Sequence, residues 1–189
     1  MSVRLLHLGC GYRRLGGFVN IDNVDYPAVD LQHDLTKPLP YLDNTVDGIY
    51  SEHFIEHITM EECLRLFSEC LRVLKPGGII RSSTPDLDYV IYSYFNHSEA
   101  VNAHWTSIAT WGKSVPSKSF LFNMAFTCWG HRYIYNYSEL KKLLETVGFK
   151  DVKKVEFQKS SFRPFEGIDY RENSLIVEAV KPEIENLIY

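Results

Sequence analysis

The chain has 189 residues, of which 45% are hydrophobic and 23% charged, and its formal net charge at pH 7 is −4. This composition is typical of a folded globular protein, and no apolar run approaches the roughly 18 residues that a membrane-spanning helix requires. The negative charge argues against a nucleic-acid backbone as the main partner, because neutralising phosphates demands a basic face.

The length fits one domain, and we expect a single domain over residues 1–189. The four cysteines include no Cys-x-x-Cys pair, so we interpret them as core thiols and not as a disulfide framework. The first predicted strand begins at once, without the charged and apolar regions of a secretory signal. We therefore expect a cytoplasmic protein.

Two buried strands are predicted at 3–8 and 18–21, joined only by residues 9–17. Parallel strands normally need a crossover of a dozen or more residues, so this connection has no room for a full helix. The first strand breaks into Gly9-Cys10-Gly11 and the second ends in Asp22. Glycine lets the backbone approach a ligand closely, and a carboxylate at the next strand end can accept hydrogen bonds from both ribose hydroxyls. Together they predict a nucleoside-containing cofactor.

The next predicted elements are strands at 30–35 and 46–51, a helix at 59–74, a strand at 79–83 and a helix from about 85 to 96. The helix at 59–74 has the strongest signal, because Thr59-Met60-Glu61-Glu62 forms a capping box and apolar residues follow at helical spacing. Lys75-Pro76-Gly77-Gly78 ends it as a turn. Thr84 is the expected N-cap of the following helix.

Residues 98–136 lose regular periodicity and become aromatic and polar, which predicts an irregular insert. A helix at 138–147 that closes at Gly148 and strands at 152–157 and 174–180 complete the chain. This alternation of strands and helices indicates an α/β fold with a mostly parallel sheet. Ligands then belong at the carboxyl ends of the strands.

Five motifs occur in order: Leu-Gly-Cys-Gly at 8–11, Asn-Ile-Asp at 20–22, His-Asp-Leu at 33–35, the run 47–53, and Arg-Val-Leu-Lys-Pro-Gly-Gly at 72–78. With them the chain resembles the class I S-adenosylmethionine-dependent methyltransferases, particularly small bacterial enzymes with a Leu-Gly-Cys-Gly opening. The resemblance covers most of 3–85, and 140–149 also looks like theirs. It implies a Rossmann-like sheet with helices on both faces and an antiparallel last strand. The departure is the first crossover helix, which is shortened or missing.

The resemblance implies S-adenosylmethionine as the cofactor. It assigns to this cofactor the residues Gly9, Cys10, Gly11, Asp22, Asp34, Leu35, Ser51 and Glu52. The glycine turn would line the methionine and ribose portions, and Asp22 would hold the ribose hydroxyls. Asp34 and Leu35 match the positions that contact the adenine. Ser51 and Glu52 match the part of the site that faces the methionine.

In the same frame His53 lies near the transferable methyl, where a neutral imidazole could take the proton of a hydroxyl acceptor. His131, at the end of the aromatic insert, is a second candidate base. We expect a small-molecule or sugar acceptor, methylated at oxygen and held by the insert. The alternatives are that His53 only caps its turn and that the insert is core or a homodimer contact.

His53-Phe54-Ile55-Glu56-His57 also spells the inverted zinc-peptidase motif His-x-x-Glu-His. That chemistry needs the motif inside a stable helix and a third ligand elsewhere, whereas here it precedes the Thr59 cap and fits a short turn better. The methyltransferase hypothesis requires no metal. A zinc hydrolase and a non-catalytic cofactor-binding domain are the alternative functions.

Overall fold

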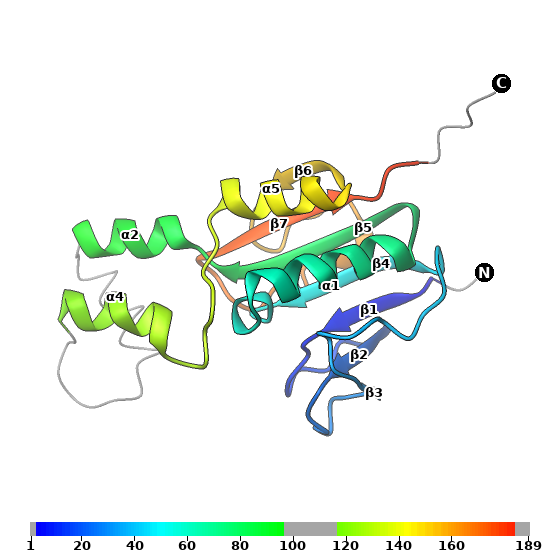
Figure 1. The fold of residues 1–189 in the computed structure, drawn as a ribbon, viewed down its shortest axis with the longest axis horizontal. Helices are drawn as coiled ribbons and strands as arrows, with labels where there is room; N and C mark the ends of the chain where they lie inside the picture. Colours follow the sequence, from blue (N-terminus) through cyan, green and yellow to red (C-terminus); the bar gives the residue numbers. More distant parts are fainter. Residues whose placement is uncertain (1–2, 97–116, 184–189) are drawn as a thin grey trace.

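The computed structural model describes residues 3–96 and 117–183. Seven strands form one sheet in the order β3-β2-β1-β4-β5-β7-β6 (Figure 1). The strands are β1 Leu5–Leu8, β2 Phe18–Asp22, β3 Leu31–Gln32, β4 Val46–Glu52, β5 Leu74–Pro85, β6 Lys150–Lys154 and β7 Ser174–Val180. The first five are parallel, and β7 is antiparallel to both of its neighbours. The predicted α/β fold with an antiparallel last strand is confirmed.

The helices are α1 Met60–Val73, α2 Leu87–Phe95, α4 Lys118–Thr127 and α5 Tyr137–Val147, with 3₁₀ turns η1 Ile55–His57 and η2 Arg163–Phe165. Helices α1 and α5 lie side by side on one face of the sheet (Figure 1). Because side chains alternate along a strand, Leu6 and Leu8 of β1 point into this layer, where they share a buried core with Phe67 and Leu140. Burying each such side chain stabilises the fold by roughly 1.5–3 kcal/mol.

The opposite face of the sheet is covered by residues 155–173, which connect β6 to β7 and include only the short turn η2. Phe162 and Phe165 of this connection pack on Gly48 of β4, where an added Cβ would lie 2.8 Å and 3.0 Å from their rings. As predicted, residues 9–17 hold no helix. In the described part of the chain, helices α1 and α5 cover one face of the sheet and an irregular segment covers the other face. The expectation of helices on both faces is therefore corrected.

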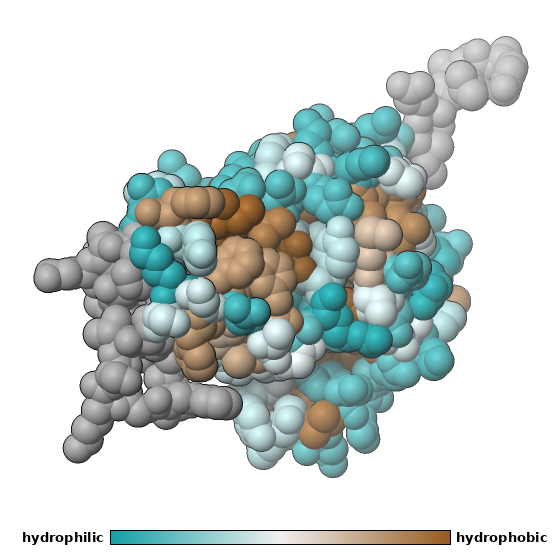
Figure 2. All heavy atoms as spheres, turned by 60° about the vertical axis from the view of Figure 1, so that its left-hand side comes forward, coloured by the Kyte–Doolittle hydropathy of each residue, from teal (hydrophilic) through white to brown (hydrophobic). Residues whose placement is uncertain are grey.

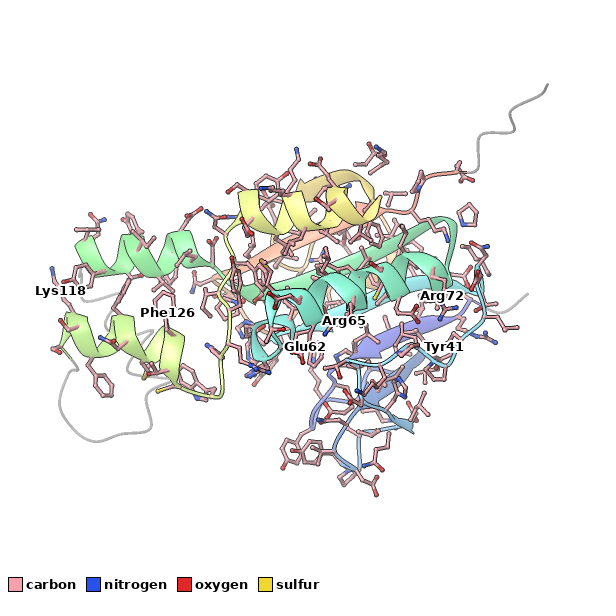
Figure 3. All side chains as sticks on the ribbon, viewed as in Figure 1. Tyr41, Glu62, Arg65, Arg72, Lys118 and Phe126 are labelled. Carbon is pink, nitrogen blue, oxygen red and sulfur yellow. The ribbon has the colours of Figure 1, made fainter. Side chains whose placement is uncertain are left out.

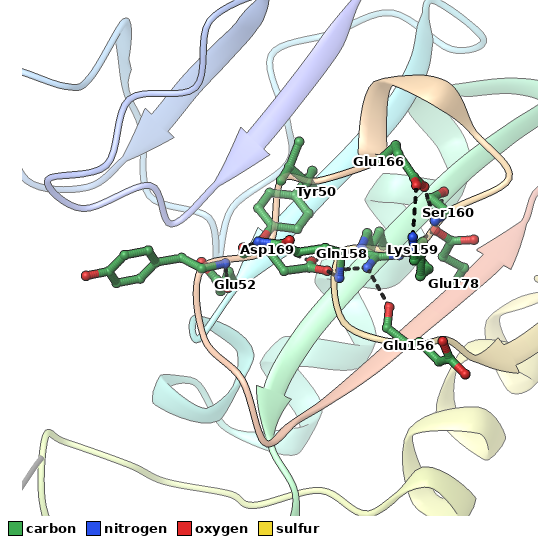
Figure 4. A network of polar contacts seen from close by, with 12 residues as sticks. Tyr50, Glu52, Glu156, Gln158, Lys159, Ser160, Glu166, Asp169 and Glu178 are labelled. Carbon is green, nitrogen blue, oxygen red and sulfur yellow. Dashed lines mark hydrogen bonds and ion pairs between the residues drawn. The ribbon is translucent and has the colours of Figure 1, made fainter. Parts of the chain in front are cut away.

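A buried guanidinium holds this covering segment to the sheet (Figure 4). Arg81 of β5 is fully buried and donates to both carboxylate oxygens of Asp169, with Nε 3.0 Å from Oδ1. Its Nη1 donates to Glu178 Oε1 at 2.7 Å and to the carbonyl of Lys159 at 2.9 Å. A buried ion pair repays its desolvation only when further hydrogen bonds satisfy its groups, and the hydrogen bonds of Arg81 to two carboxylates and a carbonyl fix where the segment docks.

A second arginine holds the connection between β3 and β4. Arg72, in the last turn of α1, lies beside Tyr41 (Figure 3) and donates from Nη1 to the carbonyl of Tyr41 at 2.9 Å. The same group donates to Asp43 Oδ1 at 2.7 Å, and Nη2 donates to the carbonyl of Leu39 at 3.1 Å. The loop that delivers β4 to the sheet is therefore pinned to the end of α1.

Several predicted boundaries are corrected. Helix α2 begins at Leu87 with Asp86 as its N-cap, because β5 runs through to Pro85 and takes Thr84 into the sheet. Residues 75–78 are a bulge within β5 and not a turn before it, since Val46 pairs with Leu74 and the next pair is Gly48 with Ile79. The capping box predicted for α1 is confirmed.

The aromatic insert is described only in part, because residues 98–116, with Trp105 and Trp111, lie outside the described residues. The expectation of irregular structure is wrong for 118–127, which form α4. Helices α2 and α4 pack through Val90, Met124 and Ala125. The outer surface of these helices and of the segment just after α4 is apolar (Figure 2), with exposed Ile91, Tyr92, Phe95, Phe126 and Trp129. In the described residues, no helix is long and apolar enough to cross a membrane.

Candidate functional site

A cavity of about 430 Å³ lies at the carboxyl ends of the parallel strands, where ligands bind in open α/β sheets. Its lining comes from the segments after β1 to β4: Gly9, Gly11, Tyr12, Asp22, Asn23, Val24, Tyr26, Asp34, Leu35, Thr36, His53, Phe54, His57 and Ile58. This volume is in the range of small-molecule and cofactor sites.

The turn after β1 depends on two glycines with left-handed backbone. Gly9 has φ of +64°, and a Cβ there would lie 2.4 Å from the ring of Phe54, so only glycine fits. Gly11 has φ of +52° and open space where a Cβ would be. Its N–H donates to Asp22 Oδ2 at 2.8 Å, while the N–H of Cys10 donates to the carbonyl of Ile21 at 3.1 Å. These two bonds tie the ends of β1 and β2 together where a helix is missing.

The carboxylate of Asp22 is held from both sides. Oδ2 accepts from Gly11 and Oδ1 accepts from the N–H of Val24 at 3.0 Å. A carboxylate has about four acceptor positions, so each oxygen keeps one lone pair for a further donor. Asp22 therefore lines the cavity as a fixed carboxylate with acceptor capacity left on both oxygens.

A second carboxylate and two aromatic rings complete this side of the cavity. Asp34 accepts from Thr36 Oγ1 at 2.7 Å and from its N–H at 2.9 Å, and these bonds lower the pKa of the Asp34 carboxyl. Tyr12 and Tyr26 face each other with ring centroids 4.0 Å apart. The cavity therefore combines carboxylate acceptors with flat aromatic surface, which suits a ribose and a purine ring.

Five of the eight residues predicted to bind a cofactor line this cavity: Gly9, Gly11, Asp22, Asp34 and Leu35. Cys10, Ser51 and Glu52 do not. Burial raises the pKa of the Cys10 thiol to about 11. Ser51 bonds Ser82 across the sheet at 3.2 Å. Glu52 accepts from Arg13 Nη1 at 2.7 Å and from the N–H groups of Tyr170 and Arg171 at 2.8 and 3.0 Å, and so holds the covering segment.

His53 lines the cavity at the end of β4, with a left-handed φ of +50°. Its Nε2 lies 2.8 Å from Ser174 Oγ and its Nδ1 lies 3.3 Å from Glu56 Oε1. Burial, followed by the nearby charge of Arg171, lowers the pKa of His53 to about 3. The imidazole is therefore neutral at physiological pH.

The segment 53–57 does not form the helix that the inverted zinc-peptidase motif needs. It consists of a bend followed by the 3₁₀ turn η1, and α1 begins only at Met60. Glu56 is fully buried, its Oε2 accepts from Thr84 Oγ1 at 3.0 Å, and burial raises its pKa to about 7. His53 and His57 are thus not placed one turn apart on an α-helix.

His131, the second predicted base, lies behind the cavity wall. Its ring meets that of His57 edge-on, with centroids 5.0 Å apart, and its Nδ1 hydrogen-bonds the carbonyl of Ala125 at 2.7 Å. Burial lowers the pKa values of both histidines. Phe54 and Tyr26 line the cavity although no role was predicted for them, and His57 lines it although it was considered only as a ligand in the alternative zinc motif.

Comparisons with known proteins agree with this geometry. Residues 17–81 match the sequence profile of the family described as "Methyltransferase domain". The chain is 31% identical over 125 residues to a protein of Mycolicibacterium smegmatis named "Probable S-adenosylmethionine-dependent methyltransferase", covering 66% of this chain but only 37% of that protein.

Solved structures share the fold. A SAM-dependent methyltransferase from Archaeoglobus fulgidus superimposes with a TM-score of 0.58 at 17% identity, covering 95% of this chain and 86% of that one. Phosphoethanolamine N-methyltransferase 2 of Haemonchus contortus, in complex with S-adenosyl-L-methionine, superimposes with a TM-score of 0.59 at 16% identity, covering 97% of this chain and 49% of that one. The predicted resemblance to class I methyltransferases is confirmed.

Proposed function

Because residues 17–81 match a methyltransferase family and the chain has the fold of S-adenosylmethionine-dependent methyltransferases, we propose that it binds S-adenosylmethionine in the cavity and transfers the methyl to an acceptor oxygen. The observation that carries this proposal is the Asp22 carboxylate, fixed beside the Gly9–Gly11 turn with one lone pair free on each oxygen. The activity is assigned to one domain over residues 1–189.

The cofactor would run from the first strand to the third. Asp22 accepts from both ribose hydroxyls, and the methionine portion lies along Gly9 and Gly11. Asp34 accepts from the adenine amino group, with the backbone of Leu35 against the ring. Tyr12 and Tyr26 cover the pocket, where their rings also favour a sulfonium by roughly 0.5–2 kcal/mol. Glu52 does not contact the cofactor in this proposal, because its oxygens already accept hydrogen bonds from Arg13 and from the backbone of residues 170–171.

The reaction is an in-line displacement at the methyl carbon. The acceptor oxygen forms a bond to that carbon as the carbon–sulfur bond breaks, and the bonding pair stays on sulfur as S-adenosylhomocysteine forms. The donor is already activated, so positioning supplies most of the catalysis. The hydroxyl proton passes to His53, whose neutral ring lines the cavity. A weak base suffices, because the oxygen becomes strongly acidic as it takes up the methyl.

The acceptor is a small molecule or a sugar. Trp129 and His131, after α4, lie against each other with ring centroids 5.5 Å apart, and His131 contacts His57 of the cavity wall. These contacts support the proposal, because an aromatic surface beside the cavity wall suits the apolar face of a sugar or an aromatic alcohol.

Titration with S-adenosylmethionine tests the binding step, and S-adenosylhomocysteine release with a panel of sugars and hydroxylated small molecules tests the transfer. Binding with release upon addition of an acceptor supports the proposal. Binding without release for every acceptor favours a non-catalytic cofactor-binding domain, and no binding contradicts both.

A further inference from the structure

We propose that Glu56, His57 and His131 form a binding site for a divalent transition-metal ion of the Zn²⁺ type. One ligand atom from each residue lies within 4.8 Å of the other two. The site joins the turn η1 to the segment after α4, and it goes beyond the methyl transfer proposed above.

The first argument is an unsatisfied buried oxygen. Glu56 is fully buried, and its Oε1 has no hydrogen-bond partner in the described structure, although His53 Nδ1 lies 3.3 Å away. Leaving a buried polar atom unpaired costs about 1–3 kcal/mol, and more for a charged group. Oε2 is already oriented by Thr84 Oγ1 at 3.0 Å, as ligating carboxylates usually are by their neighbours. A cation at Oε1 would satisfy the free oxygen.

The second argument is the orientation of the histidines. Nδ1 of His131 lies 2.7 Å from the carbonyl of Ala125, so it must donate, and the lone pair of the ring is then on Nε2. Metal-binding histidines characteristically donate their other N–H to a carbonyl or carboxylate in this way. The ring of His57 meets that of His131 edge-on at 5.0 Å, and both are half-buried, so an ion can enter from solvent.

The backbone already holds the two segments together. The carbonyl of Glu56 accepts from the N–H groups of Arg132 and Tyr133, at 2.7 Å and 3.3 Å. Zinc binds nitrogen and oxygen at about 2.0–2.2 Å, which in tetrahedral geometry places its ligand atoms about 3.3–3.6 Å apart. Ligand atoms that lie up to 4.8 Å apart must therefore approach each other by as much as about 1.5 Å, a movement that rotation of the two half-buried histidine side chains would supply. Two imidazoles and one carboxylate suit zinc, and three protein ligands leave a fourth position for water.

This ligand set differs from the inverted zinc-peptidase motif, and the difference makes the site testable. That motif would use His53 and His57 as ligands with Glu56 as the base. In the proposed site His53 is not a ligand and Glu56 is. The positive charge of Arg171 acts on both ligand histidines and opposes a cation, and the Glu56 carboxylate supplies the compensating charge.

The experiment is a titration of the chelator-treated protein with Zn²⁺ by calorimetry and with Co²⁺ by visible absorption. We expect one ion per chain. His57→Ala, His131→Ala and Glu56→Gln should each weaken binding by at least about 100-fold, because losing a residue that only hydrogen-bonds to a metal ligand already costs about 10- to 100-fold. His53→Ala should keep binding. His33→Ala is the matched control, since its Nε2 contacts the carbonyl of Pro38 elsewhere.

Circular dichroism checks that each variant is folded. If His131→Ala does not fold, His57→Gln replaces it as a milder test, because His57 is only half-buried. Absence of saturable binding to the wild type would overturn the proposal. Unchanged metal binding in His131→Ala would also overturn the proposal. If His53→Ala lost metal binding while His131→Ala kept it, the inverted zinc-peptidase motif would be favoured instead.

Discussion

The N–H of Gly11 donates to Asp22 Oδ2 across 2.8 Å and so joins the ends of β1 and β2 directly. In a chain with no helix between these strands, this bond and the neighbouring one from Cys10 to Ile21 shape the turn. The same carboxylate is the proposed ribose acceptor. Structure and ligand binding thus converge on Asp22.

Gly9→Ala should destabilise the fold, because the new methyl would lie 2.4 Å from the Phe54 ring at a residue with φ of +64°. Overpacking and backbone strain together cost about 1–3 kcal/mol in the free energy of unfolding, measurable by urea denaturation. Gly16→Ala is the control, since nothing lies within 4 Å of its Cβ position. Equal stability of the two variants would show that Phe54 does not restrict this turn.

Arg81→Met should lower the free energy of unfolding by about 3–5 kcal/mol, because the buried carboxylates of Asp169 and Glu178 lose their partner. Arg65→Met on the exposed surface of α1 (Figure 3) should change it by no more than about 0.5 kcal/mol. A loss of similar size in both variants would mean that the network does not hold the covering segment.

Stability should fall as the pH is lowered from 6.5 towards 4. Burial lowers the pKa of His7 to about 4, so in this interval the unfolded chain binds a proton that the folded chain excludes. The contribution of this residue is present above pH 6.5 and is lost towards pH 4, with a slope of at most about 1.4 kcal/mol per pH unit.

The check is urea denaturation across this pH range for the wild type, His7→Asn and the control His33→Asn. We expect a shallower slope for His7→Asn only, since His7 is buried against Asn20 whereas His33 is partly exposed. Identical slopes for all three proteins would refute the assignment.

His53→Asn should reduce kcat by about 100- to 10,000-fold without changing S-adenosylmethionine affinity, if His53 takes the acceptor proton. Asparagine is chosen because it tolerates the left-handed backbone at this position. Ser174→Ala, which removes the partner of Nε2, should have a smaller effect. An unchanged kcat in His53→Asn would leave the histidine with a structural role only.

The elements that the sequence predicts well are those set by local chemistry. The capping box at Thr59 and Glu62 and the left-handed Gly148 place the ends of α1 and α5, and the spacing of Gly9 from Asp22 predicts the short turn between β1 and β2. The missing first helix follows from the length of one connection. These features depend on neighbours in the chain.

The features that escape the sequence depend on distant contacts. The segment 155–173 covers a sheet face because Asp169 meets Arg81, 88 positions earlier, and no local pattern encodes this pairing. Likewise, His131 lies beside His57 only because the folded chain brings α4 to the end of β4. The sequence correctly predicts where β4 ends, but not the direction of the Glu52 side chain. Its carboxylate binds Arg13 instead of lining the cavity, and this depends on how distant segments pack around it.

The most direct test of the proposed function is calorimetric titration of the wild type, Asp22→Ala and the matched control Asp25→Ala with S-adenosylmethionine. Asp25 is an exposed carboxylate close by in the chain that does not line the cavity. We predict one cofactor per chain, affinity at least about 100-fold weaker in folded Asp22→Ala, and unchanged affinity in Asp25→Ala, because two charged hydrogen bonds are lost only at Asp22. No binding by the wild type at millimolar S-adenosylmethionine would contradict the account.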